Sequence, residues 1–179
     1  MGANFFRHGY RAALALAAAA GLFGSAQLLA SGGEKPRNIK YAFTPPAPQN
    51  QGWAEADGKS EGCVSCHTAS DQKTMHASPA VVLGCVDCHG GDPKVFVQPG
   101  LKSSDKAYVA ARDKAHVLPR YPETWHWPSS ANPKRGYTVL NKEAPEYVRF
   151  VNPGDYRVAR QACGACHMEV IEAAERSLM

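Results

Sequence analysis

The hydrophobic pattern along this chain predicts short helices and loops rather than a sheet. Residues 104–115 predict a helix that ends at His116. Near the C-terminus, a second helical pattern gathers Val170, Ala174 and Leu178 on one face. The run Val95-Phe96-Val97 is the segment that most resembles a strand, and it is very short. The pattern therefore predicts a mainly α protein with extensive irregular loops and little or no sheet.

Residues 1–30 differ in kind from the rest of the chain. Arg7 and Arg11 precede an uncharged, apolar run over residues 12–24, and small residues follow. This order is typical of a secretory signal peptide, with cleavage after Ala26 or a few residues later. Retention of the segment as an N-terminal membrane anchor is the alternative that the sequence leaves open. Both readings predict a periplasmic or otherwise exported protein.

The remaining chain is poor in the side chains that build an apolar core. It contains many of the 13 prolines and 16 glycines, and few large aliphatic residues. Residues 31–60 predict a proline-rich linker, and residues 118–122 predict a wrapping loop. A turn at residues 152–155 predicts that Asp155 caps the helix leading to Cys163. Because ordering the chain costs entropy, something other than its side chains must fill the interior of residues 61–179.

Charge narrows the range of partners only slightly. The chain has 20 Lys and Arg against 16 Asp and Glu, a formal net charge of +4. The basic residues are scattered, with no run longer than Lys134-Arg135. We therefore expect no nucleic-acid partner.

Three identical cysteine patterns are the strongest chemical signal in the sequence. Every cysteine belongs to a C-x-x-C-H motif, the sequence that attaches c-type haem. The two thiols bond to the vinyl groups on one porphyrin edge, and the adjacent histidine binds the iron. The motifs predict three haem c groups, attached at Cys63, Cys66, Cys85, Cys88, Cys163 and Cys166, with His67, His89 and His167 as iron ligands.

Other uses of paired cysteines explain this pattern less well. Structural zinc takes two such pairs for each site, so that one of three pairs would be left over. Disulfides suit an exported chain but give no reason for a histidine after every second cysteine. A thioredoxin-like site has one C-x-x-C within a βαβ unit, and no such unit is visible here.

Three further histidines lie outside the motifs and the N-terminal segment: His76, His116 and His126. Because each iron has a second axial position, the simplest prediction is histidine on both sides of all three irons. Such saturated irons suit electron transfer and leave no open place for a substrate. The sequence does not indicate which of these histidines serves which haem.

The first two motifs resemble the multihaem c-type cytochromes of bacterial respiration. The resemblance covers Cys63-Val64-Ser65-Cys66-His67, Met75-His76-Ala77 and Gly84-Cys85-Val86-Asp87-Cys88-His89-Gly90-Gly91. It implies a small multihaem cytochrome fold organised around covalently bound haems, over residues 61–179. It also implies an electron carrier with redox partner proteins.

The resemblance leaves two broader alternatives open. The region from Asn152 to Met179 is similar to a one-haem segment of long multihaem cytochromes, which allows this chain to be the N-terminal part of a longer one, or part of a larger cytochrome assembly. The alternative function is the haem-bearing part of a multihaem oxidoreductase that reduces a nitrogen or sulfur oxyanion. That function requires one iron with an open axial position.

Overall fold

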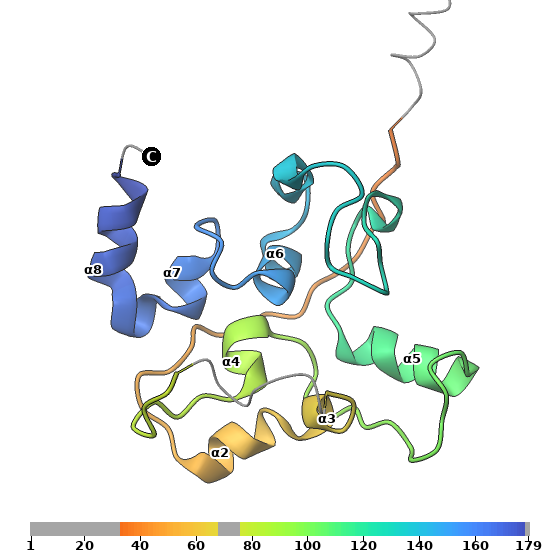
Figure 1. The fold of residues 1–179 in the computed structure, drawn as a ribbon, viewed down its shortest axis with the longest axis horizontal. Helices are drawn as coiled ribbons and strands as arrows, with labels where there is room; N and C mark the ends of the chain where they lie inside the picture. Colours follow the sequence, from red (N-terminus) through yellow and green to blue (C-terminus); the bar gives the residue numbers. More distant parts are fainter. Residues whose placement is uncertain (1–32, 68–75, 178–179) are drawn as a thin grey trace, which may run out of the picture. The chain divides into compact units, whose positions relative to one another are not determined.

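The computed structural model describes residues 33–67 and 76–177, and in these ranges the chain is mainly helical (Figure 1). No strand occurs there, and one isolated bridge joins Trp125 to Pro133. Long irregular segments connect helices of 4 to 12 residues, which confirms the predicted fold class at this level. The α-helices are α2 (Trp53–Gly58), α3 (Glu61–Val64), α4 (Cys85–His89), α5 (Lys106–Ala115), α6 (Pro145–Val151), α7 (Ala159–Ala162) and α8 (Gly164–Glu175), with 3-10 turns η1 (Pro122–Thr124) and η2 (Tyr137–Asn141).

The individual elements agree with the sequence pattern to different degrees. The helix expected at residues 104–115 is α5, and it ends directly before His116, as predicted. Residues 95–97 form no strand, since no other described segment pairs with them. Asp155 lies in the expected turn, but Val158 is the N-cap of α7, and the Asp155 carboxylate accepts the N–H of Arg157. The predicted signal peptide lies outside the described residues.

The apolar core of the described region is small and lies between residues 117 and 158. Trp125 and Tyr147 meet edge to face with ring centroids 5.1 Å apart, and both side chains are buried. Around them pack Leu140, Val148 and Val158, with Val117, Trp127, Val139 and Val151 partly buried against the cluster. By contrast, α5 buries no residue, and α2 buries only Ala56. Most of the helices that carry or flank the motifs therefore lack an apolar core of their own.

Residues 36–60, which we expected to form a linker, lie in the same compact unit as the motifs, and that unit runs from Pro36 to Met179. The extended segment donates the N–H of Arg37 to the Arg120 carbonyl at 2.8 Å, and that of Ala47 to the Gln161 carbonyl at 3.1 Å. An extended, proline-rich backbone makes no hydrogen bonds within itself, so its amides remain available to other segments. We call the extended part of this segment, which precedes α2, the strap.

The loop at residues 118–125 is fastened by one buried carboxylate. Glu143 accepts the backbone N–H groups of Arg120 and Tyr121 and the indole N–H of Trp125, at 2.7 to 3.1 Å. These three donors satisfy an acidic side chain that is only 8% exposed.

No helix within residues 33–67 and 76–177 is both long and apolar enough to cross a membrane.

Candidate functional site

Each C-x-x-C-H motif forms a single helical turn. In motif 1 the N–H groups of Cys66 and His67 both donate to the Cys63 carbonyl, and in motif 3 those of Cys166 and His167 donate to the Cys163 carbonyl. Motif 2 is the whole of α4. A helical turn brings residues three apart to the same face, so the two cysteines of each motif share one side.

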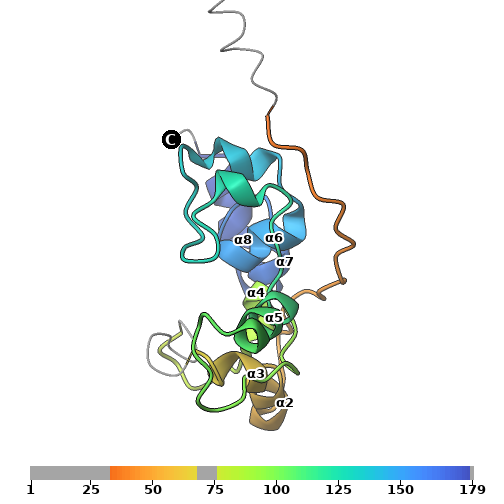
Figure 2. The same cartoon turned by 90° about the vertical axis from the view of Figure 1, so that its right-hand side faces the viewer.

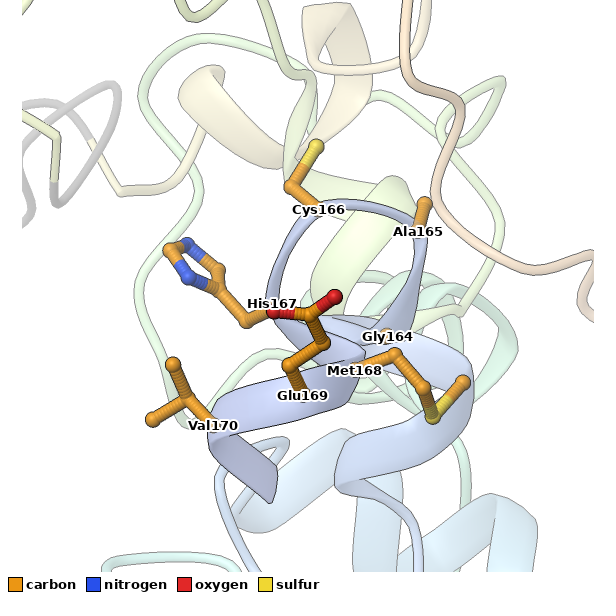
Figure 3. Close-up of a pocket in the computed structure, with 7 residues that line it drawn as sticks. All are labelled: Gly164, Ala165, Cys166, His167, Met168, Glu169 and Val170. Carbon is orange, nitrogen blue, oxygen red and sulfur yellow. The ribbon is translucent and has the colours of Figure 1, made fainter. Parts of the chain in front are cut away.

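A kink in the backbone separates motif 3 from the rest of α8. The backbone of His167 leaves the helical region, with φ −116° and ψ 20°, and so kinks α8 directly after the motif. Residues 164–170 line a hollow of about 290 Å³. Figure 3 shows His167 and Val170 on one side of the helix and Met168 on the other. The Met168 sulfur lies 3.3 Å from Nη1 of Arg160, so this methionine faces away from His167.

Motifs 1 and 2 are joined through the residues just before them. The Ser60 hydroxyl accepts the N–H of Cys85 at 2.9 Å and donates to the Ala56 carbonyl at 3.0 Å. The carbonyl of Lys59 accepts the N–H of Val86. These bonds connect the start of α4 to Lys59 and Ser60, the two residues between α2 and α3.

Close backbone approach requires the glycine that precedes each of the two motifs. At the α2–α4 junction, a Cβ at Gly84 would lie 2.5 Å from the Ala56 carbonyl oxygen, and at a separate contact a Cβ at Gly62 would clash with the carbonyl oxygens of Pro93 and Val95. Both contacts are shorter than a carbon and an oxygen can tolerate. The neighbours are backbone atoms, which cannot turn aside.

We expect Gly84→Ala to destabilise the purified protein by about 1–3 kcal/mol, since overpacking forces the α2–α4 junction apart. The measurement is the free energy of unfolding by denaturant, followed by circular dichroism. Gly58→Ala is the matched control, because a Cβ at Gly58 meets no atom within 4 Å. Equal stability of the two variants would contradict the junction described here.

Motif 2 lies between the other two motifs by the contacts of its cysteines. The Cys63 thiol is hydrogen-bonded to Cys85, which lowers the pKa of Cys85 to about 6 and raises that of Cys63. Burial, and then the neighbouring Cys163, raise the pKa of Cys88. Cys85 thus contacts motif 1, and Cys88 lies near enough to Cys163 of motif 3 to feel its charge. In agreement, α4 packs against α6 and α7 (Figures 1 and 2).

A buried carboxylate inside motif 2 holds α4 in place. Asp87 is 5% exposed, and its carboxylate accepts the N–H of Gly84 at 2.7 Å, closing the first turn of the helix. Lys59 forms an ion pair with it at 3.0 Å, and the side-chain amide of Gln51 donates to it. This network connects motif 2 to both α2 and the strap.

Two of the non-motif histidines lie beside motif histidines. His116 and His67 have ring centroids 6.1 Å apart with planes at 42°, and His76 and His167 have centroids 6.1 Å apart with planes at 10°. His116 thus meets motif 1, and His76 meets motif 3. For these two histidines the structure shows which motif lies nearby, a question that the sequence left open.

The surroundings of His116 keep its imidazole neutral. Burial, followed by the nearby His67, lowers its pKa to about 4. Its Nδ1 is buried, and no hydrogen-bond partner for this atom occurs in the described part of the chain. Trp127 and Phe150 complete its contacts, with ring centroids at 5.8 and 5.1 Å. A neutral imidazole with an unused nitrogen is the form that binds a metal.

His89 and His126 are arranged differently from the two pairs. Nδ1 of His89 lies 2.7 Å from the Phe150 carbonyl oxygen. Because a carbonyl can only accept, this nitrogen carries the proton, and Nε2 is left as the metal-binding atom. His126 is exposed, and within residues 33–67 and 76–177 no ring contact joins it to a motif histidine.

Comparison with known protein families, with curated proteins and with solved structures found no match for this chain. Among the described residues, no group of three or more His, Cys, Asp or Glu side chains is placed to hold a metal ion. A haem iron takes only two ligands from the protein, so a haem site requires a pair of ligands and not a group of three or more.

Several residues that shape the site could not be found from the sequence. Arg149 and Phe150 contact motif 2 from α6, and Trp127 contacts His116. The sequence offers one partial signal, the two aromatic residues around His126 in Trp125-His126-Trp127, because aromatic rings can pack on a porphyrin. In the structure Trp125 belongs to the apolar core instead, and Trp127 reaches the histidine.

Proposed function

We propose that this chain is an exported c-type cytochrome that carries three covalently attached haems and transfers electrons. Each haem would be held by the two thiols of one motif and by the histidine that follows them. The bound haems supply the redox chemistry, and the protein's residues attach them, bind their irons and limit the access of water. Redox proteins are the expected partners.

The spacing of the two histidine pairs carries this proposal. A metal–imidazole bond is about 2.0 Å long and a ring nitrogen lies about 1.1 Å from its ring centroid, so two imidazoles on opposite sides of one iron have centroids about 6 Å apart. Both pairs have centroids 6.1 Å apart, and each joins a motif histidine to a non-motif one. We assign His116 as the second ligand at motif 1 and His76 as the second ligand at motif 3.

Burial and hydrogen bonding around these histidines also fit a haem. The Nδ1 of His116 is buried without a hydrogen-bond partner in the described part of the chain, and a metal bound at this nitrogen would satisfy it. At motif 2, the Phe150 carbonyl orients His89 in the way that second-shell groups orient metal-bound histidines. Motif 2 meets motif 1 through Cys85 and packs against α7, which leads directly into motif 3, so it would be the middle site of an electron path.

Mass spectrometry of the purified, exported protein tests the proposal. The expected mass exceeds that of the polypeptide by three haem groups, and the Cys163→Ser/Cys166→Ser variant should carry two. A pyridine haemochrome assay should give the same counts. A mass equal to the bare polypeptide would refute the proposal.

A second candidate function is favoured by one observation at motif 2. His126 is exposed and makes no ring contact with His89 in the described part of the chain. If the iron at motif 2 has no second histidine ligand, the chain is the haem-bearing part of an oxidoreductase that acts on a nitrogen or sulfur oxyanion. A high-spin signal from one of three irons in the EPR spectrum of the purified protein would support this function, and three low-spin irons would support the electron carrier with His126 as the third distal ligand.

A further inference from the structure

Arg149 is the most deeply buried charged side chain of the described region, at 2% exposure. It lies in α6 and donates hydrogen bonds to four backbone carbonyls. Nε donates to Cys88 at 3.1 Å, Nη1 to Thr44 at 3.1 Å, and Nη2 to Pro45 at 2.9 Å and Asp87 at 2.6 Å. Four of its five N–H donors are thereby used, which leaves no bidentate face for a carboxylate.

Two of these acceptors belong to the last turn of α4. The carbonyls of Asp87 and Cys88 lie at the C-terminal end of a five-residue helix, where the helix itself offers them no partner. A guanidinium at this end satisfies both carbonyls and complements the helix dipole. The next residue, Phe150, holds the His89 ring through its carbonyl. Adjacent residues of α6 thus hold both the backbone and the imidazole of motif 2.

The charge of Arg149 is not cancelled by a contacting carboxylate. Asp87, the nearest acidic side chain in motif 2, is paired with Lys59 at 3.0 Å. No ion pair of the described residues includes Arg149. A buried cation is poorly screened and acts strongly over short distances.

We propose that Arg149 is a positioning residue that anchors motif 2 and makes its haem the most easily reduced of the three. The inference rests on the proposed function. Oxidation adds a positive charge at the iron, so a nearby buried cation disfavours the ferric state and raises the reduction potential. Among the described residues no buried cation lies at motif 3, where Glu172 and Glu175 of α8 are ion-paired with the exposed Arg160.

The test is a redox titration of the haem-loaded protein, with each haem assigned by NMR through the residues attached to it. In the parent protein, the haem on Cys85 and Cys88 should be the first to be reduced. Arg149→Gln should lower the midpoint potential of this haem and leave the other two nearly unchanged. Arg149→Lys keeps the charge, so it should retain most of the parent's potential even where it lowers thermal stability.

Arg157→Gln is the matched control, because it removes the same charge from an exposed arginine paired with Asp155. It should shift none of the three potentials selectively. If Arg149→Gln loads fewer than three haems, the order of reduction in the parent decides: motif 2 reduced first supports the inference, and any other order overturns it. With all three haems loaded, equal shifts in Arg149→Gln and Arg149→Lys, or no selective shift, also overturn it. A parent protein without haem would instead refute the proposed function.

Discussion

Replacing all six motif cysteines by serine is expected to leave a chain that loses most of its helical circular dichroism at 25 °C. The helices of the described region have 4 to 12 residues, and isolated helices of this length are marginal in water. The one apolar cluster is confined to residues 117–158, and α5 buries nothing. Without the porphyrins that we propose, little apolar surface remains to offset the cost of ordering α2, α3, α4 and α5.

Hydrogen exchange followed by mass spectrometry sharpens this expectation. In the six-serine variant, amides of α2, α4 and α5 should exchange as in an unfolded chain, whereas peptides near Trp125 and Tyr147 should retain some protection. The double variant Cys163→Ser/Cys166→Ser should keep motifs 1 and 2 protected. Native-like helix content in the six-serine variant would show that side chains alone supply the core.

If the chain carries the three haems that we propose, replacing His116 by alanine is expected to convert one of their irons from low-spin to high-spin. The variant removes the imidazole whose ring centroid lies 6.1 Å from that of His67. An iron that loses one strong axial ligand changes its spin state, which EPR and the optical spectrum both report. His76→Ala should produce the same change at motif 3.

The matched comparison is the double variant His76→Ala/His116→Ala, which should contain one more high-spin iron than either single variant. External imidazole should restore the low-spin spectrum in each case, because it can replace the missing ligand. It could not restore the spectrum of a variant that had failed to fold. Unchanged spectra in both single variants would contradict the assigned pairs. Loss of haem from the protein would be detected separately by its mass.

Much of the local structure could be predicted because it depends on neighbouring residues. The helix before His116 and the helical pattern near the C-terminus reappear as α5 and α8. The linker at residues 31–60 was predicted from proline content, which reports the lack of internal hydrogen bonds and not the presence of external ones. The amides of Arg37 and Ala47 bond to carbonyls more than 80 residues away, which no local pattern reveals.

The sequence by itself determined the local geometry of each C-x-x-C-H motif. Two cysteines and a histidine in five consecutive residues need only one helical turn to face the same way, and a helical turn is a local property. Only the tertiary structure decided which histidine lies beside which motif, and that Arg149 holds the end of α4. These arrangements bring together segments far apart in the chain, and they depend on how every intervening loop packs, which residue spacing does not specify.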